Sequence, residues 1–427
     1  MTVLVFVASL LAAMALGMPL AFSLIVSGVA LMLHLDQFDT QIVSQNLING
    51  ADNFPLMAVP FFMLAGELMN AGGMSRRIVH SALVWVGHFQ GGLGYVAVFA
   101  AIIMASLSGS AVADTAALAA VLMPMMKNAG YRMDRSAGLI AAGGIIAPVI
   151  PPSIGFILFG VIGGVSISKL FMAGIFPGVL MGLALMLTWW LVARHDRVQV
   201  SERVPLKERL RVTVDAFWCY LLAITIIGGM KMGVFTPTEA AVVAVVYALL
   251  IGLFVYREIR IQDLYGIVLA AAKTSSVVMF LVAAALVSAW LITVANIPAQ
   301  IVEMLRPFID SPRLLMVLLM LLVLIVGTAL DFAPTVLILT PVLMPLVRQA
   351  GIDPVYFGVL FIINNAIGLL TPPVGTVLNV VCGVGRIPMH EVIRGVMPFL
   401  VSQVAVMGLL VAFPELVMTP LKWLLMK

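Results

Sequence analysis

Charged residues are scarce in this chain of 427 residues. Asp, Glu, Lys and Arg together make up 10% of the sequence, whereas hydrophobic residues make up 63%. Soluble domains carry roughly a quarter charged and about half apolar residues, so this chain could not cover its surface in water. The composition therefore excludes a water-soluble protein and indicates one whose solvent is lipid. Because backbone groups in lipid must bond within their own segment, the apolar runs predict an all-α polytopic membrane protein.

Cysteine and histidine are also rare. The two cysteines, Cys219 and Cys382, lie in apolar context without metal-ligand spacing and are predicted to be packing residues. The five histidines are scattered along the chain. We therefore expect no cofactor and no metal centre built from these side chains, and we do not expect an enzyme.

The net charge of +4 is carried by short connections between apolar runs. The segment from Arg194 to Arg211 is the most basic of these connections and holds Arg194, Arg197, Arg203, Lys207, Arg209 and Arg211. Since Lys and Arg beside membrane spans mark the cytoplasmic side, this segment is predicted to be a cytoplasmic linker. It is not interpreted as a nucleic-acid-binding surface.

The apolar runs divide the chain into five parts. Each span needs about 20 mainly apolar residues. Residues 1–53 are predicted to hold one retained N-terminal span, not a signal peptide, and an interfacial segment. The other predicted parts are repeat 1 at 54–193 (hairpin near 92–127, broken helix 136–165), the linker with two scaffold spans and an interfacial segment at 194–272, repeat 2 at 273–417 (hairpin near 312–347, broken helix 355–384), and a tail at 418–427.

The two repeats are related by one constant difference in residue number, which we call the repeat offset. Leu122-Met123-Pro124 returns as Leu343-Met344-Pro345, and Pro151-Pro152 returns at the same offset as Pro372-Pro373. Matching apolar segments broken by Pro and Gly in two halves of a chain point to the binding site of a secondary transporter. Identity at one offset does not decide whether the copies are parallel or inverted.

Each repeat has a polar turn inside a long apolar run. Such a run is too long for one membrane span and too short for two, which is typical of a re-entrant hairpin. Non-helical backbone at that depth must be buried in protein or line a wet cavity. The candidate binding residues of these turns are Ser106, Ser108, Gly109, Ser110, Asp114 and Thr115 in repeat 1 and Gly327, Asp331 and Thr335 in repeat 2.

Each repeat also has a helix that prolines must interrupt. Paired prolines remove backbone donors, and the residue before each proline is pushed out of the helical region. Unwinding frees carbonyl oxygens for a cation such as Na⁺, while half-helix N-termini suit a substrate carboxylate. The candidate residues are Gly143, Ala147, Pro148, Pro151, Pro152 and Ser153 in repeat 1 and Asn364, Asn365, Gly368, Thr371, Pro372 and Pro373 in repeat 2.

Other interpretations of these residues stay open. The breaks could be tolerated kinks with small residues for close helix packing. Asp114 and Asp331 are acids at membrane depth, which favours function, but helix capping at a hairpin tip explains them equally well. Their separation in the chain does not match the repeat offset. Two carboxylates could also form an intramembrane aspartyl protease, although the Gly-x-Gly-Asp context is missing.

Several blocks together resemble the large membrane subunit of tripartite ATP-independent periplasmic (TRAP) transporters. These blocks are Pro60 to Glu67, Met69 to Gly73, Ser106 to Thr115, Ala147 to Ser153, Phe235 to Ala240 and Thr371 to Gly375. The resemblance covers almost the whole chain and is greatest to permeases for keto sugar acids and C4-dicarboxylates. It implies an elevator-type, Na⁺-driven importer of organic acids in the bacterial inner membrane, with two inverted repeats.

The resemblance also implies partners and ion sites. A periplasmic binding protein would deliver the substrate, and a separate small four-helix membrane subunit would brace the scaffold. Na⁺ would bind at Ser108, Ser110 and Ala147 in repeat 1 and at Gly327, Gly368 and Thr371 in repeat 2. The second hairpin lacks the serine cluster of the first. A stand-alone carboxylate carrier, which needs no binding protein, is the alternative within transport.

Overall fold

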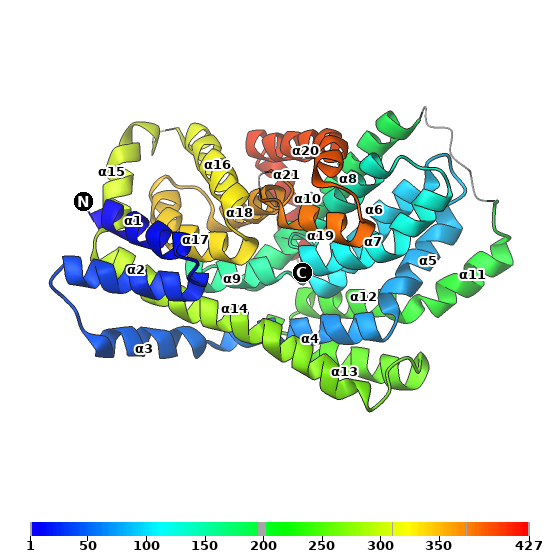
Figure 1. Ribbon diagram of the computed structural model, residues 1–427, viewed down its shortest axis with the longest axis horizontal. Coiled ribbons are helices and arrows are strands. Elements are labelled where there is room, and N and C mark those ends of the chain that lie inside the picture. The colour runs from blue at the N-terminus through cyan, green and yellow to red at the C-terminus, as the bar shows by residue number, and fades with distance from the viewer. Residues whose placement is uncertain (1, 195–201, 310, 373, 426–427) are drawn as a thin grey trace.

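The computed structural model describes residues 2–194, 202–309, 311–372 and 374–425. The described residues form helices joined by short connections, which confirms the predicted all-α fold (Figure 1). Seven of the described helices are long and apolar enough to cross a membrane. An eighth span results if α11 (Leu206–Asp215) and α12 (Phe217–Lys231), bent by 53°, count as one. The chain is therefore a multi-pass membrane protein.

The repeat seen in the sequence recurs in the helix boundaries. Helix α7 (Ala111–Asn128) and helix α17 (Phe332–Gln349) both begin and end at the repeat offset from each other. The preceding helices, α6 (Gly92–Ser108) and α16 (Pro312–Ala329), also end at this offset. Helices α8 (Met133–Gly144) and α18 (Pro354–Gly368) begin at this offset. The matched sequence blocks thus specify matched elements.

The helices after the breaks follow the same pattern with one additional residue. Helix α9 (Ile154–Gly163) corresponds to α19 (Thr376–Gly385), and α10 (Ile167–Ala193) corresponds to α20 (Met389–Ala412). In both pairs the second helix begins one position later than the repeat offset would place it. Because α18 also extends further than α8 does, the second break (369–375) is nevertheless shorter than the first (145–153).

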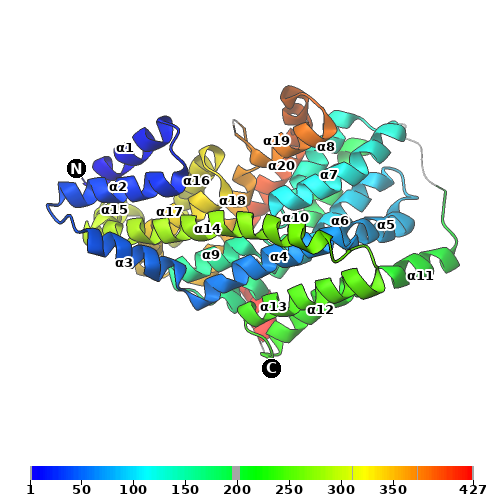
Figure 2. The ribbon, with the colours of Figure 1, turned by 60° about the horizontal axis from the view of Figure 1, so that its bottom comes forward.

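One group of helices packs around the long helix α14 (Asp263–Val294), which crosses the lower half of the molecule in Figure 1 and its middle in Figure 2. Helices α2 (Leu20–His34), α3 (Thr40–Ala51) and α4 (Ala58–Ala71) all pack against α14. Helix α13 (Pro237–Leu250) packs on α4, and its first turn is held by a capping box between Thr236 and Glu239. We refer to α2, α3, α4, α13 and α14 as the frame.

The other group interleaves the two repeats. Helix α7 of repeat 1 packs on α19 of repeat 2, and α17 of repeat 2 packs on α9 of repeat 1. Helix α8 packs closely on α20, where a Cβ added to Gly138 would lie 2.5 Å from the Gly395 carbonyl oxygen. We refer to α6–α10 and α16–α20 as the repeat core. Its two halves form one packed body, because each supplies the partner helices of the other.

The N-terminal part differs from the prediction. The predicted single span near 3–33 is two helices, α1 (Thr2–Ala15) and α2, which pack against each other. The chain turns between them because Gly17 adopts a left-handed φ of 81° and Pro19 cannot continue the first helix. The apolar run is long enough for one span, but these two residues divide it.

The linker region also differs from the prediction. The interfacial segment predicted at the end of the 194–272 region is largely the first part of the continuous helix α14, since no proline interrupts it. Two further short helices are α5 (Met74–Val86) and α15 (Ile297–Ile309). Of the basic linker, residues 195–201, including Arg197, lie outside the described residues. The remaining helices are the short 3-10 turn η1 (Phe54–Met57), the π-turn η2 (Ile251–Val255) and the C-terminal α21 (Glu415–Leu425).

Candidate functional site

The tip of the first hairpin sits directly on the first broken helix. Helix α6 ends at Ser108, Gly109 turns the chain with a left-handed φ of 64°, and Ser110 caps α7 by accepting a hydrogen bond from the Ala113 amide. A Cβ at Gly109 would clash with the Pro152 carbonyl oxygen. Only glycine allows this contact, so the tip and the break form one local structure.

Asp114 is buried just inside this tip. Its side chain is 2% exposed, and its Oδ1 accepts a hydrogen bond of 2.5 Å from the Ser108 hydroxyl. The Ser108 oxygen in turn accepts a hydrogen bond from the Ser110 amide at 3.2 Å. The other carboxyl oxygen, Oδ2, has no hydrogen-bond partner in the described structure. A buried polar atom without a partner is costly, so this oxygen is available to a ligand.

Thr115 adds a second buried oxygen beside Asp114. Its side chain is fully buried and its Oγ1 also has no partner among the described residues. A Cβ added to Gly144 would overlap this oxygen. The Thr115 hydroxyl therefore points at the last residue of α8, where the broken helix begins to unwind.

The first break spans residues 145–153 and is entirely buried. Pro151 has no N–H to donate to the Ala147 carbonyl four residues earlier, so that carbonyl lacks its helical donor. The Ser153 hydroxyl donates to the Pro148 carbonyl and accepts from the Phe156 amide at 3.2 Å, which caps α9. Pro148 and Ser153 thus shape the break, while the Ala147 carbonyl accepts no backbone hydrogen bond from the described residues.

The second hairpin repeats this arrangement with different side chains. Helix α16 ends at Ala329, and a Cβ at Gly368 would lie 2.8 Å from the Gly327 carbonyl carbon and oxygen. The Asn365 amide donates to the Phe332 carbonyl at 2.8 Å and so ties the hairpin to α18. The fully buried Asn365 Oδ1 has no partner in the described structure. It is the counterpart of the open oxygens in repeat 1.

The second break is more open than the first. The Thr371 amide donates to the Gly368 carbonyl at 3.0 Å, and its hydroxyl donates to the Ile367 carbonyl at 2.8 Å. Thr371 and Pro372 are half-buried, and Pro373 lies outside the described residues. Helix α19 begins after Gly375, which has a φ of 46° and provides no side-chain cap.

The second hairpin tip also contacts the helix that follows the first break. The Phe332 ring at the second hairpin tip reaches α9, where a Cβ at Gly155 would lie 2.6 Å from the ring. The Ser108 Cβ of the first tip approaches Gly66 of the frame helix α4, at 3.8 Å from a Cβ added there. The second hairpin tip therefore contacts the broken helices of both repeats.

A comparison with protein families decides the identity. Residues 7–416 match the family model of the tripartite ATP-independent periplasmic transporter, DctM component. The chain belongs to the TRAP transporter large permease family. This confirms the resemblance inferred from the sequence and the location in the inner membrane.

Two curated relatives and one solved structure are informative. The permease is 56% identical to the 2,3-diketo-L-gulonate TRAP transporter large permease of Escherichia coli, over 99% of this chain and 100% of that protein. It is 35% identical to the C4-dicarboxylate TRAP transporter large permease of Pseudomonas aeruginosa, over 94% of each chain. The crystal structure of the YdaH transporter of Alcanivorax borkumensis, 15% identical, matches 89% of this chain and 88% of its own with a TM-score of 0.64. That last likeness shows the fold alone.

The family assignment shows that the aspartyl protease alternative is wrong. The relatives are transporter permeases, not enzymes. The two acids also have different surroundings in the permease: Asp114 is buried against Ser108, whereas Asp331 is exposed and lies 3.5 Å from the Thr376 hydroxyl. They do not form a matched pair.

The structure pairs each acid with a different residue. Ser110 and Asp331, related by the repeat offset, are the N-cap residues of α7 and α17. Asp114 and Thr335, related by the same offset, lie at the fourth position of these helices, and the Thr335 hydroxyl donates to the Asp331 carbonyl. Asp331 occupies an N-cap position but its side chain makes no cap bond, and Asp114 lies inside α7, so helix capping explains neither acid.

Two of the predicted residues, Gly143 and Asn364, lie beside the breaks and face a hairpin arm. A Cβ at Gly143 would contact Ala101 of α6, and Asn364 donates to the Met320 carbonyl of α16. Ser106 donates to Ile103 within its own helix at 2.6 Å. The contacts of Gly143 and Asn364 join the broken helices to the hairpin arms, whereas the Ser106 bond lies within α6.

The sequence interpretation did not single out Phe332 and Gly155. Their contact joins a hairpin tip of one repeat to the broken helix of the other. Neither residue type signals such a role, because the contact depends on the interleaving of the repeats.

Proposed function

We propose that this permease imports an organic acid by secondary active transport driven by Na⁺. One observation carries the proposal. In both repeats a hairpin tip packs on a proline-broken helix, and buried side-chain oxygens without partners lie at that contact, namely Asp114 Oδ2, Thr115 Oγ1 and Asn365 Oδ1. Unwound backbone and neutral oxygens at such places are the usual ligands of a coupling ion in transporters.

The residues present fit a monovalent cation in repeat 1. The proposed site comprises the hydroxyls of Ser108 and Ser110 and the Ala147 carbonyl. The Asp114 and Thr115 oxygens extend this set toward Gly144. One carboxylate among hydroxyl and carbonyl oxygens balances a single positive charge in a buried site. Na⁺ binding would give the orphan oxygens the partner that the protein does not supply.

The second proposed site has no carboxylate among its predicted ligands. It comprises the Gly327 and Gly368 carbonyls and the Thr371 hydroxyl, with Asn365 Oδ1 beside Gly327. This hairpin lacks the serine cluster of the first, and the side-chain amide oxygen of Asn365 would take its place as a ligand. An all-neutral oxygen set suits Na⁺ better than a divalent ion, which would require more negative charge.

The substrate proposed is a sugar acid or keto acid that carries a carboxylate. The 56% identity to a diketogulonate permease, against 35% to a C4-dicarboxylate permease, supports the sugar-acid class. Helix α19 begins without a side-chain cap, so its first amides can receive a carboxylate.

We propose that the repeat core moves as one body against the frame, in an elevator motion with inverted repeats. The interleaved packing of α7 with α19 and of α17 with α9 supports a rigid core, because neither repeat can move without the other. As a TRAP permease, the chain is proposed to act with a small four-helix membrane subunit and a periplasmic substrate-binding protein.

The test is uptake of labelled 2,3-diketogulonate by cells that express the permease, the small subunit and the binding protein. We expect uptake in Na⁺ medium and little in K⁺ medium of equal ionic strength. Omitting the binding protein should abolish uptake. Uptake that persists without it would favour a stand-alone carrier, and equal uptake in Na⁺ and K⁺ would contradict Na⁺ coupling.

A further inference from the structure

A cavity lies on the seam between the frame and the repeat core. It has a volume of about 700 Å³ and lies between α3 and α14 of the frame and α9 and α17 of the core. Helix α14 lines it with Leu286, Ala289, Trp290 and Thr293, which recur every three or four residues and so share one helix face. Helix α17 does the same with Pro341, Met344, Pro345 and Arg348. The cavity is therefore bounded by two matched helix stripes, with Asn46 and Asn49 of α3 beside them.

The polar lining lies near the ends of the helices. Trp290 and Thr293 belong to the last two turns of α14, and Arg348 belongs to the last turn of α17. Helix α3 is much less apolar than the spans and carries Asn46 and Asn49. Tryptophan and arginine near span ends are typical of the level where lipid headgroups begin. The cavity thus has a polar part at headgroup depth and apolar walls, including Ile162.

The polar groups of the cavity are rich in hydrogen-bond donors. Arg348 provides a guanidinium, Trp290 an indole N–H, and Asn46 and Asn49 side-chain amides. No Asp or Glu is among the described residues that line it. The described structure also contains no ion pair to Arg348 within salt-bridge distance. Such a set of donors around an unpaired cation attracts an anion.

Arg348 is held in place without using up its donors. One Nη atom donates to the Gly163 carbonyl at 2.7 Å, at the C-terminus of α9, where the helix dipole favours a cation. Gly164 ends α9 with a φ of 62°, and a Cβ there would lie 3.4 Å from the guanidinium. A guanidinium has five N–H donors, so the others remain free for a second acceptor. Its fork geometry matches the oxygens of a phosphate.

We propose that this cavity binds the phosphate of a membrane phospholipid, with its glycerol and upper acyl chain against the apolar walls. Arg348 and the Trp290 indole would donate to the phosphate oxygens, with Asn46 or Asn49 completing the set. A free inorganic anion would not contact the apolar residues Ile162, Leu286 and Met344 favourably, whereas an acyl chain would pack against them. The headgroup would contact the frame and the repeat core at once. If the core moves as proposed above, the site exists only while the two bodies hold this relative position.

The experiment measures lipid binding to the purified full chain in detergent, without substrate or partner. Thermal unfolding and retained phosphorus per protein are followed while phosphatidylglycerol is added. Diacylglycerol with the same acyl chains and sodium phosphate serve as the other two probes. We expect phosphatidylglycerol alone to raise the unfolding midpoint. Because no transport is measured, failure here would not bear on the proposed import.

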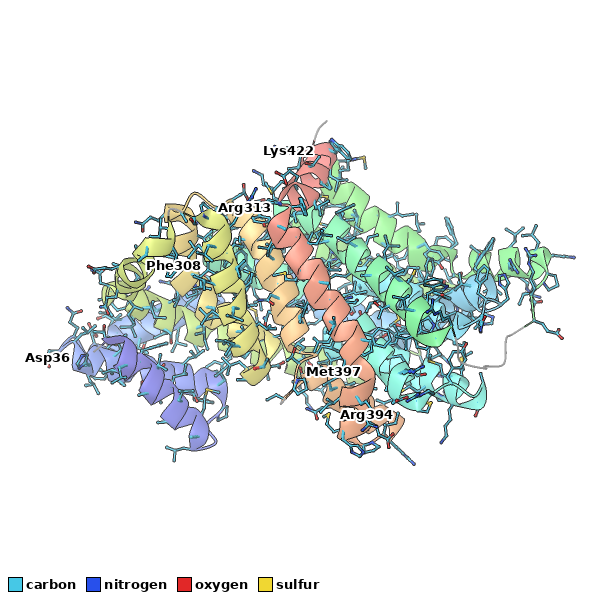
Figure 3. The ribbon with its side chains drawn as sticks, turned by 90° about the horizontal axis from the view of Figure 1, so that it is seen from above. Asp36, Phe308, Arg313, Arg394, Met397 and Lys422 are labelled. Carbon is cyan, nitrogen blue, oxygen red and sulfur yellow. The ribbon has the colours of Figure 1, made fainter. Side chains whose placement is uncertain are left out.

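Variants locate the site. Arg348→Gln should require about tenfold or more phosphatidylglycerol for the same effect, since it loses the charged donor. Trp290→Phe keeps the ring, removes the N–H and should show a smaller shift in the same direction, which covers the case in which Arg348→Gln fails to fold. The matched control is Arg394→Gln on α20, a surface arginine far from Asp36 and the adjoining start of α3 (Figure 3).

Each alternative result has a definite meaning. Equal stabilisation by sodium phosphate would replace the lipid by a free anion and overturn the proposal. Equal stabilisation by diacylglycerol would show that the phosphate is not recognised. If Arg348→Gln, Trp290→Phe and Arg394→Gln all bind like the unaltered protein, the lipid binds elsewhere.

Discussion

Replacing Gly368 by alanine should disable the second cation site. The added Cβ would lie 2.8 Å from the Gly327 carbonyl carbon and oxygen and 3.0 Å from its Cα, whereas ordinary contacts begin at 3.4 Å. The atoms in the way are backbone on both sides, so no rotamer change relieves the clash. The hairpin tip would have to move away from α18 by about 0.6 Å, the difference between 3.4 and 2.8 Å.

The magnitude follows from overpacking in a tight interior. Such insertions cost about 1–3 kcal/mol. If the displacement falls on the Gly327 and Gly368 carbonyls, Na⁺ affinity should drop roughly tenfold or more, since about 1.4 kcal/mol is a factor of ten. The control is Gly383→Ala in α19, where a Cβ meets nothing within 4 Å and helix propensity should raise stability slightly.

The assay is Na⁺-dependent uptake together with Na⁺-dependent thermal stability, for both variants at equal expression. We expect Gly383→Ala to match the unaltered permease. Gly368→Ala should fold but need much more Na⁺ for either effect. If Gly368→Ala responds to Na⁺ like Gly383→Ala, the contact between hairpin tip and break does not form the cation site.

The other predictions concern repeat 1. Thr115→Val removes the hydroxyl that has no partner and keeps nearly the same side-chain shape. Thermal stability without Na⁺ should therefore hold or rise, while stabilisation by added Na⁺ should weaken. The control in the same Na⁺ titration is Thr340→Val, because the Thr340 hydroxyl bonds within its own helix. Ser110→Ala should cost about 1 kcal/mol of capping and also lower Na⁺ activation of uptake, whereas the comparable cap change Ser166→Ala should cost stability alone. Replacing the Pro151-Pro152 pair by alanine should extend α8 and abolish uptake, and a fully active variant would contradict the unwound site.

The sequence predicted the elements of the repeats well because their signals are local. Prolines and polar turns inside apolar runs interrupt helices wherever they occur, so one offset sufficed to match α7 with α17 and α8 with α18. The division of residues 3–33 was missed because one Gly and one Pro outweighed a continuous apolar run.

The sequence could not predict the contacts within the site. Thr115 meets Gly144, and Phe332 meets Gly155, because helices far apart in the chain pack together. Periodicity and composition do not encode which faces meet. The repeat offset could have paired Asp331 with Ser110, but similarity of the acids suggested Asp114 instead.

The most direct test of the account is the thermal stability of the purified permease in Na⁺ against K⁺ or choline at equal ionic strength. An ion that binds only the folded protein adds about 2.7 kcal/mol of stability at a hundred times its dissociation constant. The account predicts stabilisation by Na⁺ alone, reduced in Thr115→Val and in Gly368→Ala. Equal unfolding curves in all three salts would contradict Na⁺ sites at the two breaks.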